Sequence, residues 1–77
     1  MNRIDLGLLA SLDALLTTGS VTQAAQRMHL STPAMSHALG RIRAMVGDPL
    51  LVRAGRHLVP TPRALELAGP VNRLLSE

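Results

Sequence analysis

The stretch from residue 20 to residue 47, SVTQAAQRMHLSTPAMSHALGRIRAMVG, limits the choice of fold more strictly than the rest of the chain. At its start, Ser20 is followed three residues later by Gln23, which is a capping-box pattern and predicts a helix that begins at Val21. Small side chains on one side of that helix would let a second helix cross it at close range. The expected buried side consists of Ala24, Ala25 and Met28.

A second helix is predicted over about residues 32–46. Ser31 and Thr32 can cap its free N–H groups, and Pro33 suits the first helical turn, where its missing N–H costs no hydrogen bond. Apolar residues recur at the spacing that one side of a helix requires: Met35, Leu39, Ile42 and Val46. The opposite side is small or polar and carries no acid: Pro33, Ser36, His37, Gly40, Arg41 and Ala44.

The turn between these helices completes a supersecondary unit. Leu30 lies in this turn, and we expect its apolar side chain to fill the corner between the two helices. A short helix, a turn of three or four residues and a longer helix with a polar outer side describe a helix-turn-helix, whose second helix enters the major groove of DNA. The sequence therefore favours double-stranded DNA as the partner.

Composition indicates a small, mainly helical domain. The 77 residues suffice for one domain, and its core must be built without Phe, Trp or Tyr, because the chain has none. Leu is abundant and forms helices well, whereas the aromatic residues that favour strands are absent. The formal charge is +3, and residues 14–63 hold six arginines against one acid, Asp48. Such a basic middle suggests a polyanionic partner, although a charge of this size also serves solubility.

Residue types exclude several other functions. With no cysteine, the chain cannot form disulfides, zinc ribbons or thiol-based sites, which favours a cytoplasmic protein. Asp5 and Asp13 interrupt the apolar N-terminus, which therefore resembles neither a signal peptide nor a membrane span, and no membrane partner is expected. The three histidines lack further ligands at metal-binding spacing, and the chain has no nucleophile elbow or phosphate-binding glycine loop. We therefore expect no enzyme activity, catalytic residue, cofactor or metal.

Two further elements flank the central stretch. A helical stripe near the N-terminus is expected to face the core: Ile4, Leu8, Leu12 and Leu15. After Pro49, the short apolar runs 50–52 and 58–59 enclose Gly55 and predict a β-hairpin, which we call the wing. Arg53 and Arg56 on the wing suit phosphates or the minor groove, and the alternative for each is a solvated surface turn.

A last helix is predicted to begin at Thr61-Pro62, by the same cap-then-proline pattern as at Thr32-Pro33. Gly69-Pro70 is expected to kink or interrupt it, because proline removes a hydrogen bond and clashes with the preceding turn. The helix carries more apolar surface than a small domain can cover, which suggests a partner helix. One side of it consists of Leu65, Ala68, Asn72 and Leu75.

From Leu6 to about Leu75 the chain resembles the N-terminal winged helix-turn-helix domain of LysR-type transcriptional regulators. The residues that carry the resemblance are Gly19-Ser20-Val21-Thr22-Gln23-Ala24-Ala25, Leu30-Ser31-Thr32-Pro33-Ala34-Met35-Ser36, Leu51-Val52-Arg53 and Pro60-Thr61-Pro62. The resemblance implies a mainly α fold: a three-helix core, a short β-hairpin wing over about residues 50–59 and a C-terminal linker helix. Residues 1–60 would form the DNA-binding domain, and residues 61–77 the linker and dimerisation helix.

The same resemblance implies a bacterial transcription factor that forms a homodimer through its last helix. Its intact chain would continue into a larger effector-binding domain, so that a small-molecule effector would act only through a domain absent from these 77 residues. Carried over by position, the implied DNA-binding residues are Ser20, Thr22, Ser31, Thr32, Pro33, Ser36, His37, Arg53 and Arg56. The family often has glutamine at the position of Thr32 and arginine at that of His37, and Arg41, one turn further on, is expected to compensate.

The competing hypothesis is a helical protein-interaction or dimerisation module with no nucleic-acid role. Such a module would bind a protein through its apolar last helix and use its arginines for solubility. The two hypotheses differ in their salt dependence, because DNA binding weakens steeply as salt rises whereas apolar helix pairing does not.

Overall fold

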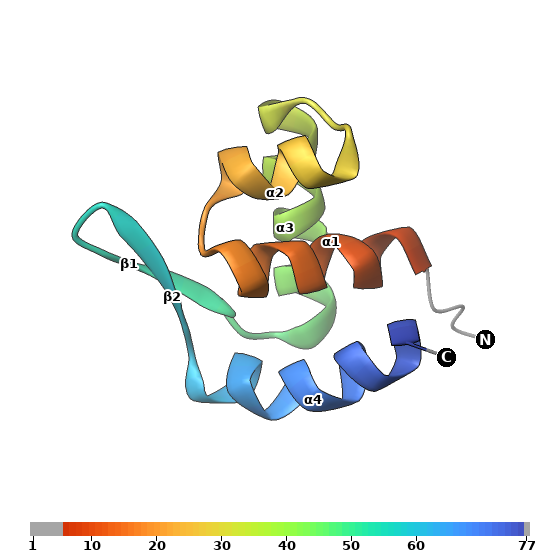
Figure 1. Cartoon of the computed structure of the whole chain (residues 1–77). Helices are drawn as coiled ribbons and strands as arrows, with labels where there is room; N and C mark the ends of the chain where they lie inside the picture. The colour runs from red at the N-terminus through yellow and green to blue at the C-terminus, as the bar shows by residue number, and fades with distance from the viewer. Residues whose placement is uncertain (1–5, 77) are drawn as a thin grey trace.

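The computed structural model describes residues 6–76. Within them the chain forms four helices and one antiparallel hairpin (Figure 1). In chain order the elements are α1 (Leu6–Thr18), α2 (Val21–Met28), α3 (Thr32–Val46), β1 (Leu51–Ala54), β2 (His57–Pro60) and α4 (Pro62–Ser76). This is the predicted winged helix-turn-helix. The expected contributions of Ile4 and Asp5 to the N-terminal segment lie outside the described residues.

Side-chain caps set the starts of α2 and α3 where the sequence predicts them. The Ser20 hydroxyl accepts a hydrogen bond from the Gln23 N–H at 3.2 Å, and the Ser31 hydroxyl accepts one from the Ala34 N–H at 3.2 Å. Each bond satisfies one of the N–H groups that a helix start leaves without a partner. The two helices of the motif are therefore fixed by local chemistry.

The turn between α2 and α3 corrects one prediction. His29 ends α2 in the left-handed conformation, and the Leu30 N–H donates to the Ala25 carbonyl at 2.9 Å. This places the Leu30 side chain outward, with 40% of its surface exposed, so the expectation that it fills the corner between the helices is wrong. Met28, the last residue of α2, packs against the core from this end instead.

The core consists of two apolar clusters on either side of α1, which Figure 1 shows between α2 and α4. The first joins α1, α2, α3 and the hairpin: Ala14, Leu15, Ala24, Ala25, Met35, Ala38, Leu39 and Leu51. The second joins α1, α3 and α4: Leu12, Ile42, Leu50, Ala64 and Val71. Because aromatic side chains are lacking, small alanines and branched residues fill both clusters, and the helices can approach closely.

The wing is a short hairpin that rests on the helices. Its register pairs Leu51 with Pro60 and Ala54 with His57, and Gly55 takes a positive φ of 66° in the turn. Both strands extend further toward the tip than the predicted apolar runs, while Leu50 lies outside β1. A hydrogen bond from the Leu58 N–H to the Gly19 carbonyl, at 3.2 Å, ties the hairpin to the chain between α1 and α2.

The last helix, α4, continues through Gly69 and Pro70, so of the predicted kink or interruption, the interruption is wrong. Pro70 and the preceding turn at Glu66 are exposed, and water can reach the carbonyl that proline leaves without an N–H partner. On the opposite side Ala64 and Val71 are buried in the second cluster. Packing on this side holds the helix together across the proline.

Candidate nucleic-acid interface

The outer side of α3 is open along its whole length. All six residues predicted for it are exposed: Pro33, Ser36, His37, Gly40, Arg41 and Ala44. Ser31 and Thr32, at the start of the helix, are exposed as well, while Met35 and Ile42 are buried on the other side. The helix therefore presents a narrow, acid-free surface of hydroxyl, imidazole and guanidinium groups.

A groove lies between the start of α2 and the wing. It has a volume of about 360 Å³, and its walls are residues 19–23 on one side and Arg53 with residues 56–58 on the other. Sequence spacing alone gives no reason to place Ser20 and Thr22 opposite Arg53 and Arg56, but the structure brings all four to this groove. The first turn of α2 contributes N–H groups and the positive end of its dipole. The groove thus suits an anion such as a phosphate.

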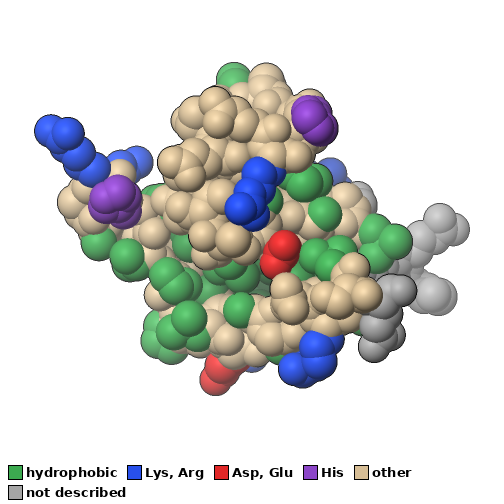
Figure 2. Space-filling view, viewed as in Figure 1, with side chains coloured by type: hydrophobic (Ala, Val, Ile, Leu, Met, Phe, Trp, Pro, Cys, Tyr) green, Lys and Arg blue, Asp and Glu red, His purple; other side chains and the backbone are tan. Residues whose placement is uncertain are grey.

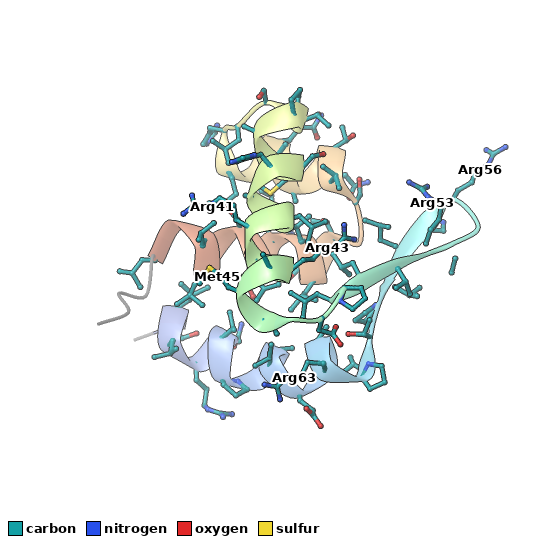
Figure 3. The ribbon with its side chains drawn as sticks, turned by 180° about the vertical axis from the view of Figure 1, so that it is seen from behind. Arg41, Arg43, Met45, Arg53, Arg56 and Arg63 are labelled. Carbon is teal, nitrogen blue, oxygen red and sulfur yellow. The ribbon has the colours of Figure 1, made fainter. Side chains whose placement is uncertain are left out.

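The basic side chains flank α3 on both sides. Figure 3 shows Arg41 on one side of α3, and Arg53 and Arg56 near the tip of the hairpin on the other. Blue side chains at the hairpin tip also project away from the body of the molecule in Figure 2. Arg53 and Arg56 are exposed and make no hydrogen bond or ion pair within residues 6–76. Their donors are therefore available to a partner.

Arg43 and Asp48 behave differently from the other charged residues of the basic middle. The Arg43 Nε donates to the Pro49 carbonyl at 2.7 Å, and its Nη2 donates to the Leu51 carbonyl at 2.8 Å. Asp48 Oδ2 accepts hydrogen bonds from the Leu50 N–H and the Thr61 hydroxyl, both at 2.7 Å. In the sequence, Arg43 looks like the other arginines of the basic middle. No local pattern indicates that its guanidinium binds the protein's own backbone.

Along α4, the residues predicted to contact a partner helix differ in exposure. Leu65 is 63% exposed and Leu75 is 37% exposed; Asn72 is exposed as well, and Ala68 is half-buried at the edge of the core. Leu74, on the other flank, is 55% exposed. The helix thus retains uncovered leucines after packing its Ala64 and Val71 side onto the domain.

The described part of the chain contains no candidate metal site and no candidate membrane-spanning helix. Among its His, Cys, Asp and Glu side chains, no three lie close enough together to hold a metal ion. Within residues 6–76, every helix falls short of the length and hydrophobicity needed to cross a bilayer.

Sequence comparison identifies relatives that match most of the chain. Residues 6–65 match the family model described as "Bacterial regulatory helix-turn-helix protein, lysR family". Nodulation protein D 1 of Bradyrhizobium sp. (strain NC92) is 53% identical over 72 residues, which cover 94% of this chain and 23% of that protein. Nodulation protein D 2 of Sinorhizobium fredii has the same identity and coverage. The chain thus spans about a quarter of the length of these relatives.

Solved structures agree with this assignment. A probable transcriptional regulator from Pseudomonas aeruginosa superposes with a TM-score of 0.90 and 44% identity, covering 95% of this chain and 24% of that one. The BenM DNA-binding domain, solved in complex with catB site 1 DNA, superposes with a TM-score of 0.87 and 26% identity, covering 95% of this chain and 82% of that one. The chain belongs to the LysR family of bacterial regulatory helix-turn-helix proteins.

Proposed function

We propose that this domain binds double-stranded DNA sequence-specifically within a bacterial transcription regulator. The observation that carries the proposal is that the exposed outer side of α3 and the groove between α2 and the wing both lack acidic side chains and both present hydroxyl groups and arginines or a histidine. A similar domain, that of BenM, was solved with DNA. In this arrangement α3 lies in the major groove, and the wing contacts the backbone or the minor groove.

The two parts of the surface have different tasks. Base edges are contacted from the first half of α3, and the residues assigned to this role are Ser31, Thr32, Pro33, Ser36, His37 and Arg41. Phosphates are contacted from the groove, and the residues assigned to this role are Ser20, Thr22, Arg53 and Arg56. Sequence preference therefore depends on α3, while affinity and its salt dependence rest largely on the groove.

The remaining assignments concern the longer protein. We divide the chain into a DNA-binding domain, residues 1–60, and a linker and dimerisation helix, residues 61–77. A homodimer forms through Leu65, Ala68, Asn72 and Leu75. We place the regulator in the cytoplasm, where it has access to DNA, and any small-molecule effector binds to the part of the regulator beyond this domain. The relatives are about four times as long as this chain, which leaves room in them for an effector-binding part.

Salt dependence tests the DNA-binding proposal against the interaction-module alternative. Anisotropy of a labelled promoter-like duplex is measured with micromolar protein as salt rises from about 50 to 200 mM. We expect binding whose logarithmic affinity falls with log salt by about 0.9 per phosphate neutralised. No anisotropy change at about 50–100 mM salt would refute DNA binding, and self-association that is insensitive to salt would favour the alternative.

Gly40 provides a test of close approach by α3. A Cβ at this position would meet nothing within 4 Å inside the domain, so packing against the wing does not explain the glycine. Gly40→Ala should therefore stabilise the free domain by about 1 kcal/mol, since glycine disfavours helix interiors by that amount. If α3 lies against DNA at Gly40, the added methyl group should weaken binding, as measured by anisotropy on the same duplex.

Gly69→Ala is the matched control for Gly40→Ala. Gly69 lies in the interior of α4, and its new Cβ would make only an ordinary contact, 3.5 Å from Arg73 Nη1. Thermal unfolding should show stabilisation by Gly40→Ala, whereas at Gly69 the helix-propensity gain is offset because Pro70 follows and disfavours the helical conformation of a preceding residue that carries a Cβ. Only the change at Gly40 should reduce DNA affinity. Unchanged affinity in both would remove Gly40 from the interface.

Leu65 tests the dimer assignment. It is the most exposed leucine of the predicted side of α4, so an aspartate there leaves the domain's own core intact. Leu65→Asp should convert dimers to monomers in analytical ultracentrifugation, because a charge in an apolar helix pair is left without solvent or partner. The control is Leu74→Asp, since nine residues place Leu74 about two and a half turns away, on the opposite flank. Equal mass for the Leu65 variant and the parent protein would contradict the assignment.

A further inference from the structure

The junction between α3 and the wing contains an unusual backbone conformation. Leu50 has a positive φ of 64°, and it is completely buried in the second core cluster. The Leu51 N–H donates to the Pro49 carbonyl at 2.6 Å, which closes a γ-turn centred on Leu50. A γ-turn with positive φ is rare and strained, and leucine has no local preference for it. Surrounding contacts must therefore hold the chain in this form.

Arg43 holds the γ-turn from the α3 side. Its Nε and Nη2 bind the carbonyls of Pro49 and Leu51, the two residues on either side of Leu50. Figure 3 shows Arg43 on the side of α3 that faces the hairpin. Two donors of a planar guanidinium fix the relative orientation of the two peptide groups, because the fork has one geometry. The direction in which β1 leaves the turn is thus coupled to α3.

Asp48 and Thr61 hold the same turn from the α4 side. Asp48 Oδ2 accepts from the Leu50 N–H, and also from the Thr61 hydroxyl. The Thr61 N–H donates to the Leu50 carbonyl at 2.9 Å, and its hydroxyl oxygen accepts from the Ala64 N–H in the first turn of α4. Both ends of the hairpin, just before β1 and just after β2, are thereby joined at one point.

We propose that Arg43 and the Asp48–Thr61 pair are positioning residues for DNA binding, which set the direction of the wing relative to α3. A two-stranded hairpin is marginal by itself in water, so its direction depends on what anchors its base. Arg53 and Arg56 lie beyond this base and can reach phosphates only when the wing is aimed correctly. The expected effect on DNA affinity rests on the proposed function, whereas the direction and rigidity of the wing are properties of the free domain.

The test compares Arg43→Met with Arg43→Lys. Methionine removes the charge and both donors, whereas lysine retains the charge and loses the fork. We expect Arg43→Met to lower the salt slope of DNA binding by the amount that two phosphate contacts contribute, because the contacts of Arg53 and Arg56 are lost together. Arg43→Lys should recover little of the lost slope. In an Arg53→Ala, Arg56→Ala background, Arg43→Met should have no further effect on the slope. A loss of about one phosphate that lysine restores would mean that Arg43 itself binds a phosphate, and would overturn the proposal.

A measurement without DNA separates failure of this inference from failure of the proposed function. Heteronuclear NOE values of the free, folded domain should fall at residues 53–58 in Arg43→Met and stay unchanged in α3. A wing as rigid as that of the parent protein would overturn the positioning role, whether or not the parent binds DNA. If Arg43→Met does not fold, Thr61→Val replaces it, with Thr61→Ser as the variant expected to restore wing rigidity because it keeps the hydroxyl.

Discussion

Replacing Leu15 by alanine should destabilise the domain by about 2–5 kcal/mol. Leu15 has no exposed surface, and it lies in the cluster that joins α1, α2, α3 and the hairpin. Its neighbours in this cluster, among them Met35 and Leu39, are already buried, so the loss reflects both the apolar contacts removed and the cavity that remains. A domain of this length has a total stability of only about 4–12 kcal/mol, so much of it would be lost. Urea denaturation followed by circular dichroism measures the change.

Leu6→Ala is the control for Leu15→Ala. Leu6 lies at the start of the same helix and is 67% exposed, so the same chemical change there should alter stability by no more than about 0.5 kcal/mol. Similar losses in the two variants would contradict the description of α1 as the helix around which both clusters pack.

Removing Arg53 and Arg56 together should have the largest effect on DNA binding. Both are exposed and lack partners among residues 6–76, so their replacement by alanine should leave the fold intact. Loss of two phosphate contacts lowers the salt slope by about 1.8, which corresponds to a loss of affinity on the order of 10- to 100-fold at about 0.1 M salt. Anisotropy titrations at several salt concentrations measure both quantities.

Arg63→Ala with Arg73→Ala removes the same charge from α4. Arg63 forms an exposed ion pair with Glu66 at 3.3 Å, and such pairs contribute little to stability. This control should change the slope much less than the wing variant, because α4 lies away from the groove that Arg53 and Arg56 line. Equal effects of the two double variants would mean that only net charge matters.

The elements that carry their own stop and start signals could be predicted from the sequence. Ser20 and Ser31 cap α2 and α3 as expected, and the predicted apolar positions 35, 39 and 42 are buried along one side of α3. A helix has one period, so identifying its buried side also identifies its outer side. For this reason the exposed positions on α3 follow from the sequence alone.

Features that depend on contacts between distant residues could not be predicted. The left-handed Leu50 is maintained by Arg43 and Thr61, which lie seven and eleven positions away, and no local pattern indicates such bonds. Leu30 is apolar, which predicts burial, but the cap at His29 turns it outward. Gly69-Pro70 predicts a kink or an interruption of α4, but the helix continues to Ser76, with Val71 packed in the second cluster.

The proposed DNA-binding surface joins the start of α2, the outer side of α3 and the wing. Titration of the ¹⁵N-labelled domain with a promoter-like duplex, followed by amide chemical shifts, maps that surface residue by residue. We expect the largest changes at residues 20–23, along the first half of α3 and at residues 53–57, with little change along α4. Changes confined to α4, or no changes at about 50–100 mM salt, would contradict this arrangement.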